Sequence, residues 1–444
     1  MDLEGYAKRA LRRGLARGEI ERSLSDRILE VRDIPRGSAS RISRAVVEEA
    51  MRTLCEGERS GVTIGMFGVG SRGSGDFYTH EKIASIIGKT NAIVGSDQLD
   101  DSGVVRADDD LIVVTVDGMH SRLSDFPFLA GFHVTRASLR DIYAMGARPI
   151  ALFSDVHLAD DGDISKVFDY TAGIVSVAEV MNVPLITGST LRIGGDMVIG
   201  DRLTGCVGAV GLARHGGLTA RINARVGDTI LLTEGAGGGT ITATALYNGY
   251  PELVQETLNV KFLQACEALI RSGATTKIHA MTDVTNGGIR GDAEEISKTA
   301  KVKLVFEEDK IRQLINPKVL TMLDELEIDY MGVSVDSLLL VTPAELGAEI
   351  KSTLKNIIKV DEIGHIDRGA GAEVIRSGKR YPIKPKFRES AYTPLKKVIG
   401  EQADERDIQR MRDGVDTATT NAIRKKQKMI EYLRTGKNPP DVIC

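Results

Sequence analysis

The 444-residue sequence has no tryptophan, few aromatic residues (5%) and four scattered cysteines, Cys55, Cys206, Cys266 and Cys444. Because no two cysteines form a C-x-x-C pair, a disulfide scaffold and a zinc ribbon are not expected. A location in a reducing cytoplasm is expected instead. The longest apolar runs, such as residues 111–114, are too short to span a bilayer. A formal net charge of only -4 argues against a protein that coats nucleic acid. We therefore expect a cytoplasmic protein with neither a membrane nor a nucleic-acid partner.

Glycine is abundant (47 residues), and a 42% hydrophobic content over this length predicts two or three domains with their own cores. Residues 1–60 and 386–444 are charged and helical in pattern, and are read as extensions. Residues 61–215 and 225–385 each mix expected strands, such as 62–67, 111–116 and 338–341, with helices. Because helices and strands alternate irregularly, the predicted fold class is α+β.

Five aspartates form the first candidate site: Asp97, Asp100, Asp101, Asp117 and Asp141. Asp117 ends an apolar strand, where a carboxylate is partly buried and needs a partner. Carboxylates at strand ends and in loops are the hard oxygen ligands that Mg²⁺ prefers beside nucleotide phosphates. The turn aspartates at 108–110 are instead expected to be ordinary turn residues. Three histidines near this region, His80, His120 and His157, lack metal-binding spacing.

A glycine-rich segment, residues 65–75, follows the expected strand 62–67 and contains Gly68-x-Gly70-x-x-Gly73. One interpretation is a dinucleotide loop, with Asp97 as the ribose-binding acid, although Gly75 and its neighbours should delay the helix that opens such a site. A second is a flap over phosphate. Its contacts would be Ser71, Arg72, Gly73 and Ser74. A third is an ordinary loop.

Longer strings occur in a fixed order. They are DDSGVV (100–105), VTVDGM (114–119), SLRDIYAMGARP (138–149), ITGST (186–190), GDTILL (227–232), MTDVTNGG (281–288), SVDSLL (334–339) and IGHI (363–366). Together they resemble the aminoimidazole ribonucleotide synthetase-related (PurM-like) superfamily over about residues 90–370. That superfamily includes selenophosphate synthetase, thiamine-monophosphate kinase and the hydrogenase maturation factor HypE, a carbamoyl dehydratase.

The resemblance implies two α+β domains, with N-terminal domains pairing across a two-fold axis into a shared β-barrel, and hence a homodimer. It also implies ATP and Mg²⁺ as cofactors and phosphoryl transfer as the reaction, with charge stabilisation as the main catalytic device. The implied metal ligands are Asp100, Asp101, Asp117 and Asp141. The implied catalytic residues are Asp117, Asp141, Asp283 and Cys444. The implied nucleotide contacts include Asp100, Asp101, Asp117, Gly188 and Thr190.

Two departures separate the chain from relatives within that superfamily. Kinase and maturation-factor members carry Asp where this chain has Ser189, so a metal ligand is either lost or supplied by Asp196 or Asp201. Selenophosphate enzymes need a cysteine or selenocysteine in the N-terminal loop. Here the loop reads Ser71-Arg72-Gly73, so selenide chemistry is not expected.

Cys444 is the last residue, after a proline-stiffened tail. HypE also ends in a cysteine, which carries the carbamoyl group that it dehydrates, so maturation-type chemistry on Cys444 with a partner protein is one hypothesis. A second is phosphoryl transfer to another small-molecule or protein-bound acceptor. A third is a non-catalytic relative whose helical ends recruit partners, and a fourth is a nicotinamide-dependent oxidoreductase.

Overall fold

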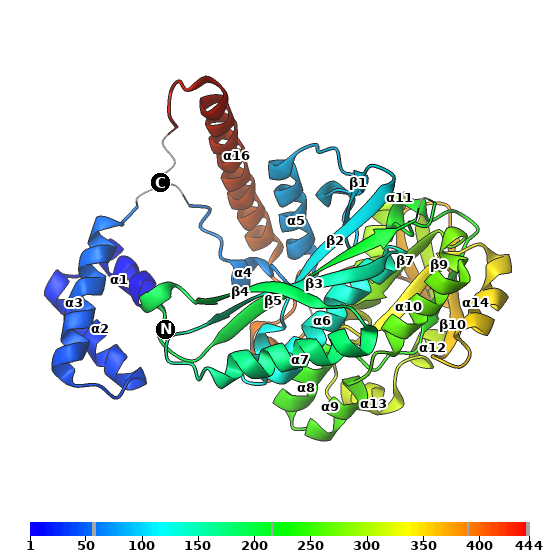
Figure 1. Cartoon of the computed structure of the whole chain (residues 1–444), viewed down its shortest axis with the longest axis horizontal. Coiled ribbons are helices and arrows are strands. Elements are labelled where there is room, and N and C mark those ends of the chain that lie inside the picture. Colours follow the sequence, from blue (N-terminus) through cyan, green and yellow to red (C-terminus); the bar gives the residue numbers. More distant parts are fainter. Residues whose placement is uncertain (56–58, 215, 389, 441–444) are drawn as a thin grey trace.

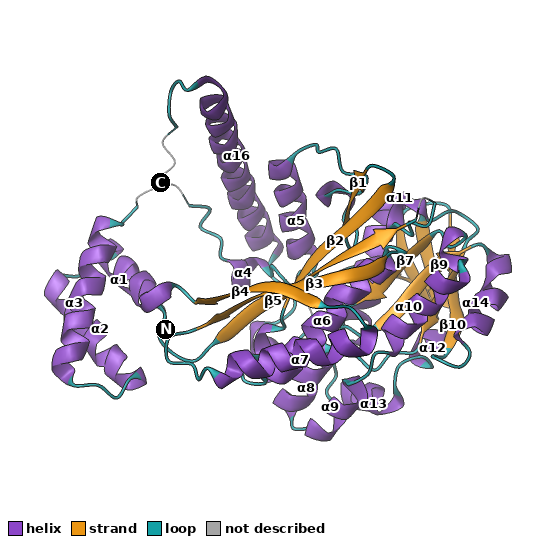
Figure 2. Ribbon diagram, in the orientation of Figure 1, coloured by secondary structure: helices purple, strands orange, loops and turns teal. Residues whose placement is uncertain are grey.

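The computed structural model describes residues 1–55, 59–214, 216–388 and 390–440. It contains two β-sheets that lie end to end in the middle of the molecule, with helices around them (Figure 1, Figure 2). A group of three helices lies at one side, and a long helix projects from the top of the view (Figure 1). In the described part of the chain, no helix has the length and apolar character needed to cross a membrane.

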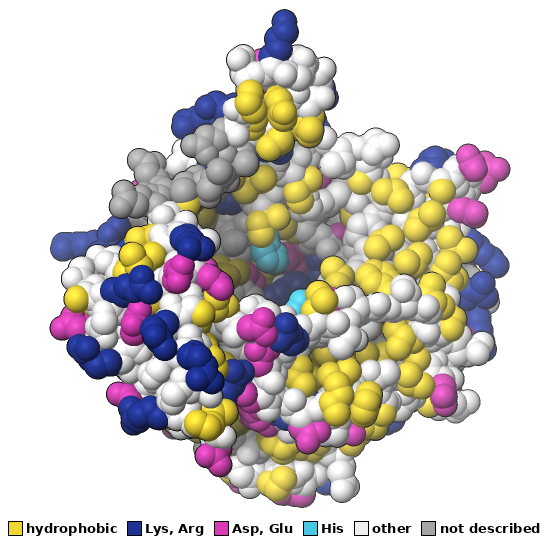
Figure 3. Space-filling view, turned by 60° about the vertical axis from the view of Figure 1, so that its left-hand side comes forward, with side chains coloured by type: hydrophobic (Ala, Val, Ile, Leu, Met, Phe, Trp, Pro, Cys, Tyr) yellow, Lys and Arg dark blue, Asp and Glu magenta, His cyan; other side chains and the backbone are white. Residues whose placement is uncertain are grey.

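The N-terminal helices are α1 (Leu3–Arg12), α2 (Arg17–Val31) and α3 (Arg36–Arg52). They enclose a small hydrophobic cluster of their own, which Ile199 of the first sheet's last connection joins. Arg32 ties the group to the same region through an ion pair with Asp161 (2.6 Å). In Figure 3 this part of the surface mixes cations and anions, whereas hydrophobic side chains gather elsewhere on the visible face.

The first sheet has the strand order β1-β2-β5-β3-β4. Its strands are β1 (Gly103–Ala107), β2 (Asp110–Gly118), β3 (Arg148–Leu158), β4 (Leu185–Arg192) and β5 (Leu203–Ala213). All neighbours are antiparallel except β3 and β4, which α7 connects. The predicted barrel is not closed: in the described part of this single chain, β1 and β4 are the two edges of an open sheet.

Helices α6 (Pro127–Ala144) and α7 (Ser165–Met181) cover one face of the first sheet (Figure 2). Two glycines allow their close approach, because a Cβ on Gly131 would lie 2.0 Å from the Tyr170 carbonyl oxygen. A Cβ on Gly173 would meet the Phe128 oxygen at 2.1 Å. The opposite face carries exposed apolar residues. They are Val105, Val114, Val116 and Leu212.

The second sheet has the order β12-β11-β8-β10-β6-β9-β7. Its strands are β6 (Thr229–Thr233), β7 (Ala280–Val284), β8 (Lys303–Glu307), β9 (Ser337–Thr342), β10 (Val360–Asp367), β11 (Gly371–Arg376) and β12 (Lys379–Ile383). Its helices are α8 (Gly239–Asn248), α9 (Val254–Thr257), α10 (Lys261–Ser272), α11 (Gly288–Ala300), α12 (Glu308–Arg312), α13 (Pro317–Glu325) and α14 (Gly347–Leu354). One hydrophobic core continues through both sheets, so the domain limits expected from sequence stay predictions.

The remaining helices are α4 (Ile64–Phe67), α5 (Ser74–Ile87), α15 (Pro394–Ile399) and α16 (Glu405–Thr435). The expected strand at residues 62–67 is wrong, because this segment forms the short helix α4. The Thr63 side chain caps α4 by accepting from the Met66 amide, and Gly68 ends it with a left-handed backbone (φ 71°). Capping at both ends therefore outweighed the β-propensity of an apolar run.

Candidate active site

Four of the predicted carboxylates converge where the two sheets meet. Asp101 precedes β1, Asp117 lies near the end of β2, Asp141 lies in α6 and Asp283 lies in β7. Burial raises the pKa of Asp141 well above its usual value, and the negative charges of Asp117, Asp283 and Asp101 raise it further. Two hydrogen bonds place these groups together, because the Thr115 hydroxyl of β2 donates to Asp141 (2.8 Å) and the neighbouring Arg140 of α6 donates to Asp283 of β7 (3.0 Å). Residues from two sheets and one helix therefore share one electrostatic site.

Asp100 has a different position from the rest of the acidic set. One of its carboxylate oxygens accepts from the Asp101 amide (3.1 Å) and the other from the Arg221 amide (2.9 Å). Burial raises its pKa to about 7, partly offset by the charge of Arg221. Asp100 therefore joins the backbone that precedes β1 to the backbone at Arg221, and its role as a metal ligand stays a prediction.

Arg221 was not foreseen, since it lies between the two expected domains, residues 61–215 and 225–385. Its side chain is fully buried and donates to Asp101, to the Leu99 carbonyl oxygen and to the Thr282 hydroxyl (2.6 Å). It also lies 3.3 Å from a Glu295 oxygen and 3.5 Å from an Asp292 oxygen in α11. An arginine among alanines in a connection gives no local sign of such a role.

A second arginine, Arg140, joins the sheets from the other side of the site. Its Nε donates to Asp283 (3.0 Å), and its guanidinium forms an ion pair with Asp336, which Arg136 shares. Burial raises the pKa of Asp283 to about 6, while the charge of Arg140 acts to lower it. Asp336 belongs to the SVDSLL string but had no predicted role; its left-handed backbone (φ 59°) is unusual for aspartate.

The glycine-rich segment is engaged by other parts of the protein. The Ser71 hydroxyl bonds to the Gly68 carbonyl oxygen, and the Ser74 amide donates to the Lys386 carbonyl oxygen (2.8 Å). A Cβ on Gly73 would lie 2.5 Å from the Phe387 oxygen, so residues 386–387 cover this loop closely. Arg72 forms an ion pair with Glu295. The cavity that remains beside Arg72 and Gly73 measures about 10 Å³, the space of one water molecule.

The dinucleotide interpretation of this segment does not hold. Such a site needs a strand before the glycines and a free helix N-terminus after them. Here the helix α4 precedes them, and α5 opens directly after Gly73, earlier than Gly75 and Asp76 suggested. The first amides of α5 are taken by the carbonyl oxygens of Lys386 and Phe387.

Gly188 and Thr190 do not join the carboxylates within one chain. Both lie on the exposed edge strand β4, and the strand register aligns Asp117 with Val207, Ser154 and Gly188 in that order. Three strand spacings correspond to about 14 Å between Asp117 and Gly188.

The proposed substitutes for the missing acid also lie elsewhere, after β4. Asp196 forms an ion pair with Arg192 (2.5 Å) and Asp201 with Lys166 (2.8 Å), and both aspartates are exposed. Cys444 lies outside the described residues. His157 bonds to Asp155 (2.8 Å), and His120 bonds to the Tyr392 hydroxyl (2.9 Å), which the C-terminal extension supplies.

The carboxylates suit a divalent cation in their chemistry. In the described ranges, no three acidic, histidine or cysteine side chains already surround a common metal position. However, the Oδ2 atom of Asp101 is buried without any hydrogen-bond partner. Burial also raises the pKa of Asp117, and the positive charges of Arg140 and Arg72 offset this rise only in part. Unpartnered carboxylate oxygens in such a site are hard ligands of the kind that Mg²⁺ takes.

Two family domains match this chain. AIR synthase related protein, N-terminal domain, matches residues 99–213, and AIR synthase related protein, C-terminal domain, matches residues 225–377. The chain belongs to the AIR synthase related protein family. The N-terminal domain thus contains the first sheet, the C-terminal domain contains most of the second, and the carboxylate site lies where the two domains meet.

The relatives of this chain differ in how much of its length they match. An uncharacterized protein of Methanocaldococcus jannaschii is 53% identical over 98% of this chain and 99% of its own length. The thiamine-monophosphate kinase of Pyrococcus horikoshii is 28% identical over 64% of this chain and 88% of its own. A selenide, water dikinase of Citrifermentans bemidjiense is 31% identical over 53% of this chain, and the match spans 66% of that enzyme.

Solved structures share the fold at low identity. A HypE–HypF complex superposes with a TM-score of 0.56 over 69% of this chain and 98% of that chain, at 16% identity. AaThiL complexed with AMPPCP and TMP gives 0.55 over 70% and 96%, also at 16% identity. The two-domain mixed α/β fold is therefore that of the AIR synthase related proteins.

Proposed function

We propose that the protein is an ATP- and Mg²⁺-dependent enzyme that transfers a phosphoryl group to an oxygen of its acceptor. The observation that carries this proposal is the convergence of Asp101, Asp117, Asp141 and Asp283 where the two family domains meet. Family membership adds to it, because the matched relatives include kinases that act on selenide and thiamine monophosphate. Phosphoryl transfer needs mainly positioning and charge stabilisation, which such a site supplies.

Each residue has a role in this proposal. Asp101, Asp117 and Asp141 would hold Mg²⁺, which when bound neutralises charge on the nucleotide phosphates. Arg140 holds Asp283 in place through its Nε. Since the pKa of Asp283 is raised to about 6, its carboxylate is suited near neutral pH to accept the proton that an amide nitrogen of the acceptor loses as the amide oxygen is phosphorylated. Asp100 keeps a supporting role, because both its oxygens already accept backbone amides.

For the acceptor, we propose an amide or carbonyl oxygen, with maturation-type dehydration of a carbamoyl group on Cys444 as the specific case. Its support is the shared fold with HypE and the terminal cysteine. Mass spectrometry of the C-terminal peptide, after incubation with ATP and a carbamoyl-donor protein, tests it. A mass change that Asp117→Ala abolishes would support this case, and an unmodified thiol with active enzyme would rule it out.

We also propose a homodimer that pairs through the open face of the first sheet. Val114, Val116 and Leu212 lie exposed on that face, and monomers rarely leave a contiguous apolar patch there. A second copy placed face to face would bury these side chains and close the barrel that one chain leaves open.

A non-catalytic relative is the second candidate, favoured by one specific observation. Residues 386–387 already bond to the glycine-rich segment that was expected to contact phosphate. If this contact is permanent, the loop cannot close over a nucleotide. Such a protein would bind no ATP at millimolar concentration.

The deciding experiment compares Asp117→Ala with Asp109→Asn, a carboxylate in the turn between β1 and β2. We expect wild type and Asp109→Asn to hydrolyse ATP with Mg²⁺ and to melt at a higher temperature when ATP is added. Asp117→Ala should lose activity by about 100-fold or more, since its group acts on the transition state. Absence of both effects in wild type would favour the non-catalytic candidate.

A further inference from the structure

Helix α16 extends beyond the body of the protein. It runs beside α5, where the Tyr78 hydroxyl donates to Asp416 (2.8 Å) and the Lys426 amine donates to the Ile86 carbonyl oxygen at the end of α5. The nine residues 427–435 therefore continue for about 13 Å past the end of α5. We call residues 423–435 the arm; it is the projection at the top of Figure 1 and Figure 3.

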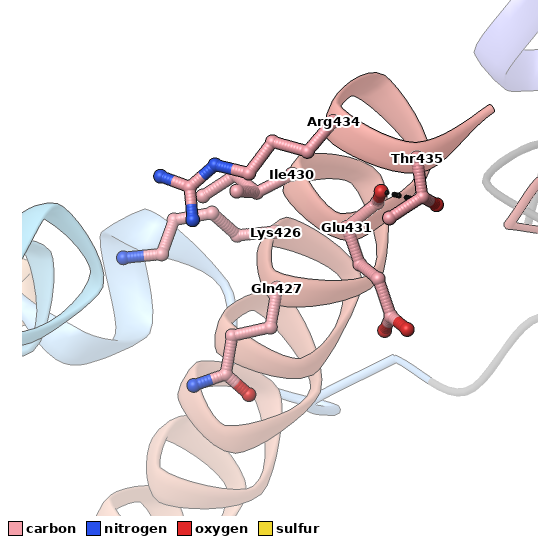
Figure 4. A pocket seen from close by; sticks show the side chains of 6 residues that line it. All are labelled: Lys426, Gln427, Ile430, Glu431, Arg434 and Thr435. Carbon is pink, nitrogen blue, oxygen red and sulfur yellow. Dashed lines mark hydrogen bonds between the residues drawn. The ribbon is translucent and has the colours of Figure 1, made fainter. Parts of the chain in front are cut away.

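The arm carries an exposed apolar strip with positive flanks. Leu433 is 74% exposed and Ile430 is 38% exposed, and Ile430 lines a shallow, open depression along the surface of α16. Figure 4 shows Lys426, Ile430 and Arg434 on one side of the helix, away from Glu431. Residues 423–437 contain six cations and one anion. They are Arg424, Lys425, Lys426, Lys428, Arg434 and Lys437, and Glu431. Helical turns without a packed apolar face are marginally stable, so a covering partner is expected.

Helix α7 has a strip of the opposite charge on its outer side. Phe168 is 64% exposed, and Ile164, which directly precedes the helix, is 59% exposed. Asp169 follows Phe168, and Glu179 lies on the same side of the helix about three turns further along. Neither acid forms an ion pair with any residue that the structure describes. The side of α7 that faces α6 is tightly packed, so the outer strip is a separate surface.

We propose that the arm of one copy docks onto the outer strip of α7 of a second copy. Leu433 and Ile430 would be buried against Phe168 and Ile164, with Arg434 facing the acids of α7. The two strips match in kind and oppose in charge, which favours this occupant over an unrelated protein. Figure 1 shows α16 at the top and α7 in the lower half of the molecule, so the arm cannot contact α7 of its own chain.

This contact is independent of the proposed catalytic function and of the sheet-face dimer. Helix α7 covers the side of the first sheet opposite to its open face, so both interfaces can form at once. We propose a head-to-tail contact, in which the copy that receives an arm on its α7 places its own arm on a further copy. Such a contact, together with the sheet-face dimer, links copies into assemblies larger than a dimer.

Sedimentation velocity of the full chain tests the proposal with Leu433→Asp, Phe168→Asp and a matched control, Val398→Asp. Val398 in α15 is 84% exposed and belongs to neither strip. We expect wild type and the control to form species larger than a dimer at micromolar concentration. Either strip variant should weaken this association by about tenfold or more, since a charge replaces a buried apolar side chain.

A mixture of the two strip variants provides the decisive test. The Phe168→Asp protein retains an intact arm and the Leu433→Asp protein an intact α7, so their mixture should recover a larger species that neither forms alone. A wild-type mass no greater than a dimer, an effect of Leu433→Asp without one of Phe168→Asp, or no recovery on mixing would each overturn the proposal. An arm that instead binds a different protein would produce one of these results.

Discussion

The two sheets differ in how much of their surface one chain covers. In the second sheet, β6, β7 and β9 are buried at every position. In the first sheet, β2 buries only alternate residues and β4 is exposed along nearly its whole length. The centre of the second sheet is therefore covered on both faces within one chain, whereas the first sheet needs another layer over its open face. The carboxylate site lies between them, joined to the second sheet by Arg140 and by Arg221.

The largest effect should separate the two sheets with the same substitution. Val341→Asp in β9 places a charge at a fully buried position and should cost about 3–5 kcal/mol or prevent folding. Val116→Asp in β2, at a position 60% exposed, should leave the fold intact and abolish the sheet-face dimer. Urea unfolding and native mass measure both effects. An equal loss of stability in the two variants would contradict this account, because it would mean that the Val116 side chain is buried within one chain.

The next effect concerns the charges between the sheets. Arg221→Ala leaves Asp101 buried without its arginine and removes one of the two arginines beside Asp292, and it should cost about 3–5 kcal/mol. Arg192→Ala removes an arginine from an exposed ion pair with Asp196 and should cost less than about 1 kcal/mol. Urea unfolding compares the two. A small cost at Arg221 would mean that the cleft charges are hydrated rather than buried.

A moderate effect is expected from pH and Mg²⁺. The pKa of Asp283 is raised to about 6 and that of Asp100 to about 7, so the folded state holds protons that the unfolded state releases. This contribution to stability is present at pH 4 and is lost as pH rises through 6 to 7. A cation held by Asp101, Asp117 and Asp141 lies close to both groups and should offset that loss, so MgCl₂ should raise Tm by about 3 °C at pH 8 and less at pH 5.5.

Thermal melting with and without Mg²⁺ checks this expectation, and Asp101→Asn should reduce the shift at pH 8. A shift that is equal at both pH values, or unchanged by Asp101→Asn, would contradict a cation at the carboxylates.

The smallest effect should be found at the edge of the first sheet. Asp196→Asn and Asp201→Asn alter exposed residues that pair with Arg192 and Lys166, far from the carboxylate site. We expect ATP affinity to change by less than about twofold, as measured by calorimetric titration. A tenfold loss in either variant would show that these residues replace the acid missing at Ser189.

The sequence predicted the family and sheet strands such as 338–341, because a strand buried on both faces is a continuous apolar run. The strand predicted from the apolar run at 62–67 was wrong, because capping by Thr63 and Gly68 makes this segment a short helix. The convergence of Asp101, Asp117 and Asp141 followed from the family strings. Arg221 could not be foreseen, because its partners lie up to 122 residues away along the chain. The engagement of the glycine-rich segment by residues 386–387 depends likewise on a contact between distant segments.

The most direct test is to locate a metal ion. Crystals grown with Mn²⁺ and a non-hydrolysable ATP analogue would reveal the ion by its anomalous scattering. We predict a peak bounded by oxygens of Asp101, Asp117 and Asp141, beside the nucleotide phosphates. A nucleotide bound elsewhere, or no peak at these carboxylates at saturating Mn²⁺, would contradict the proposed site.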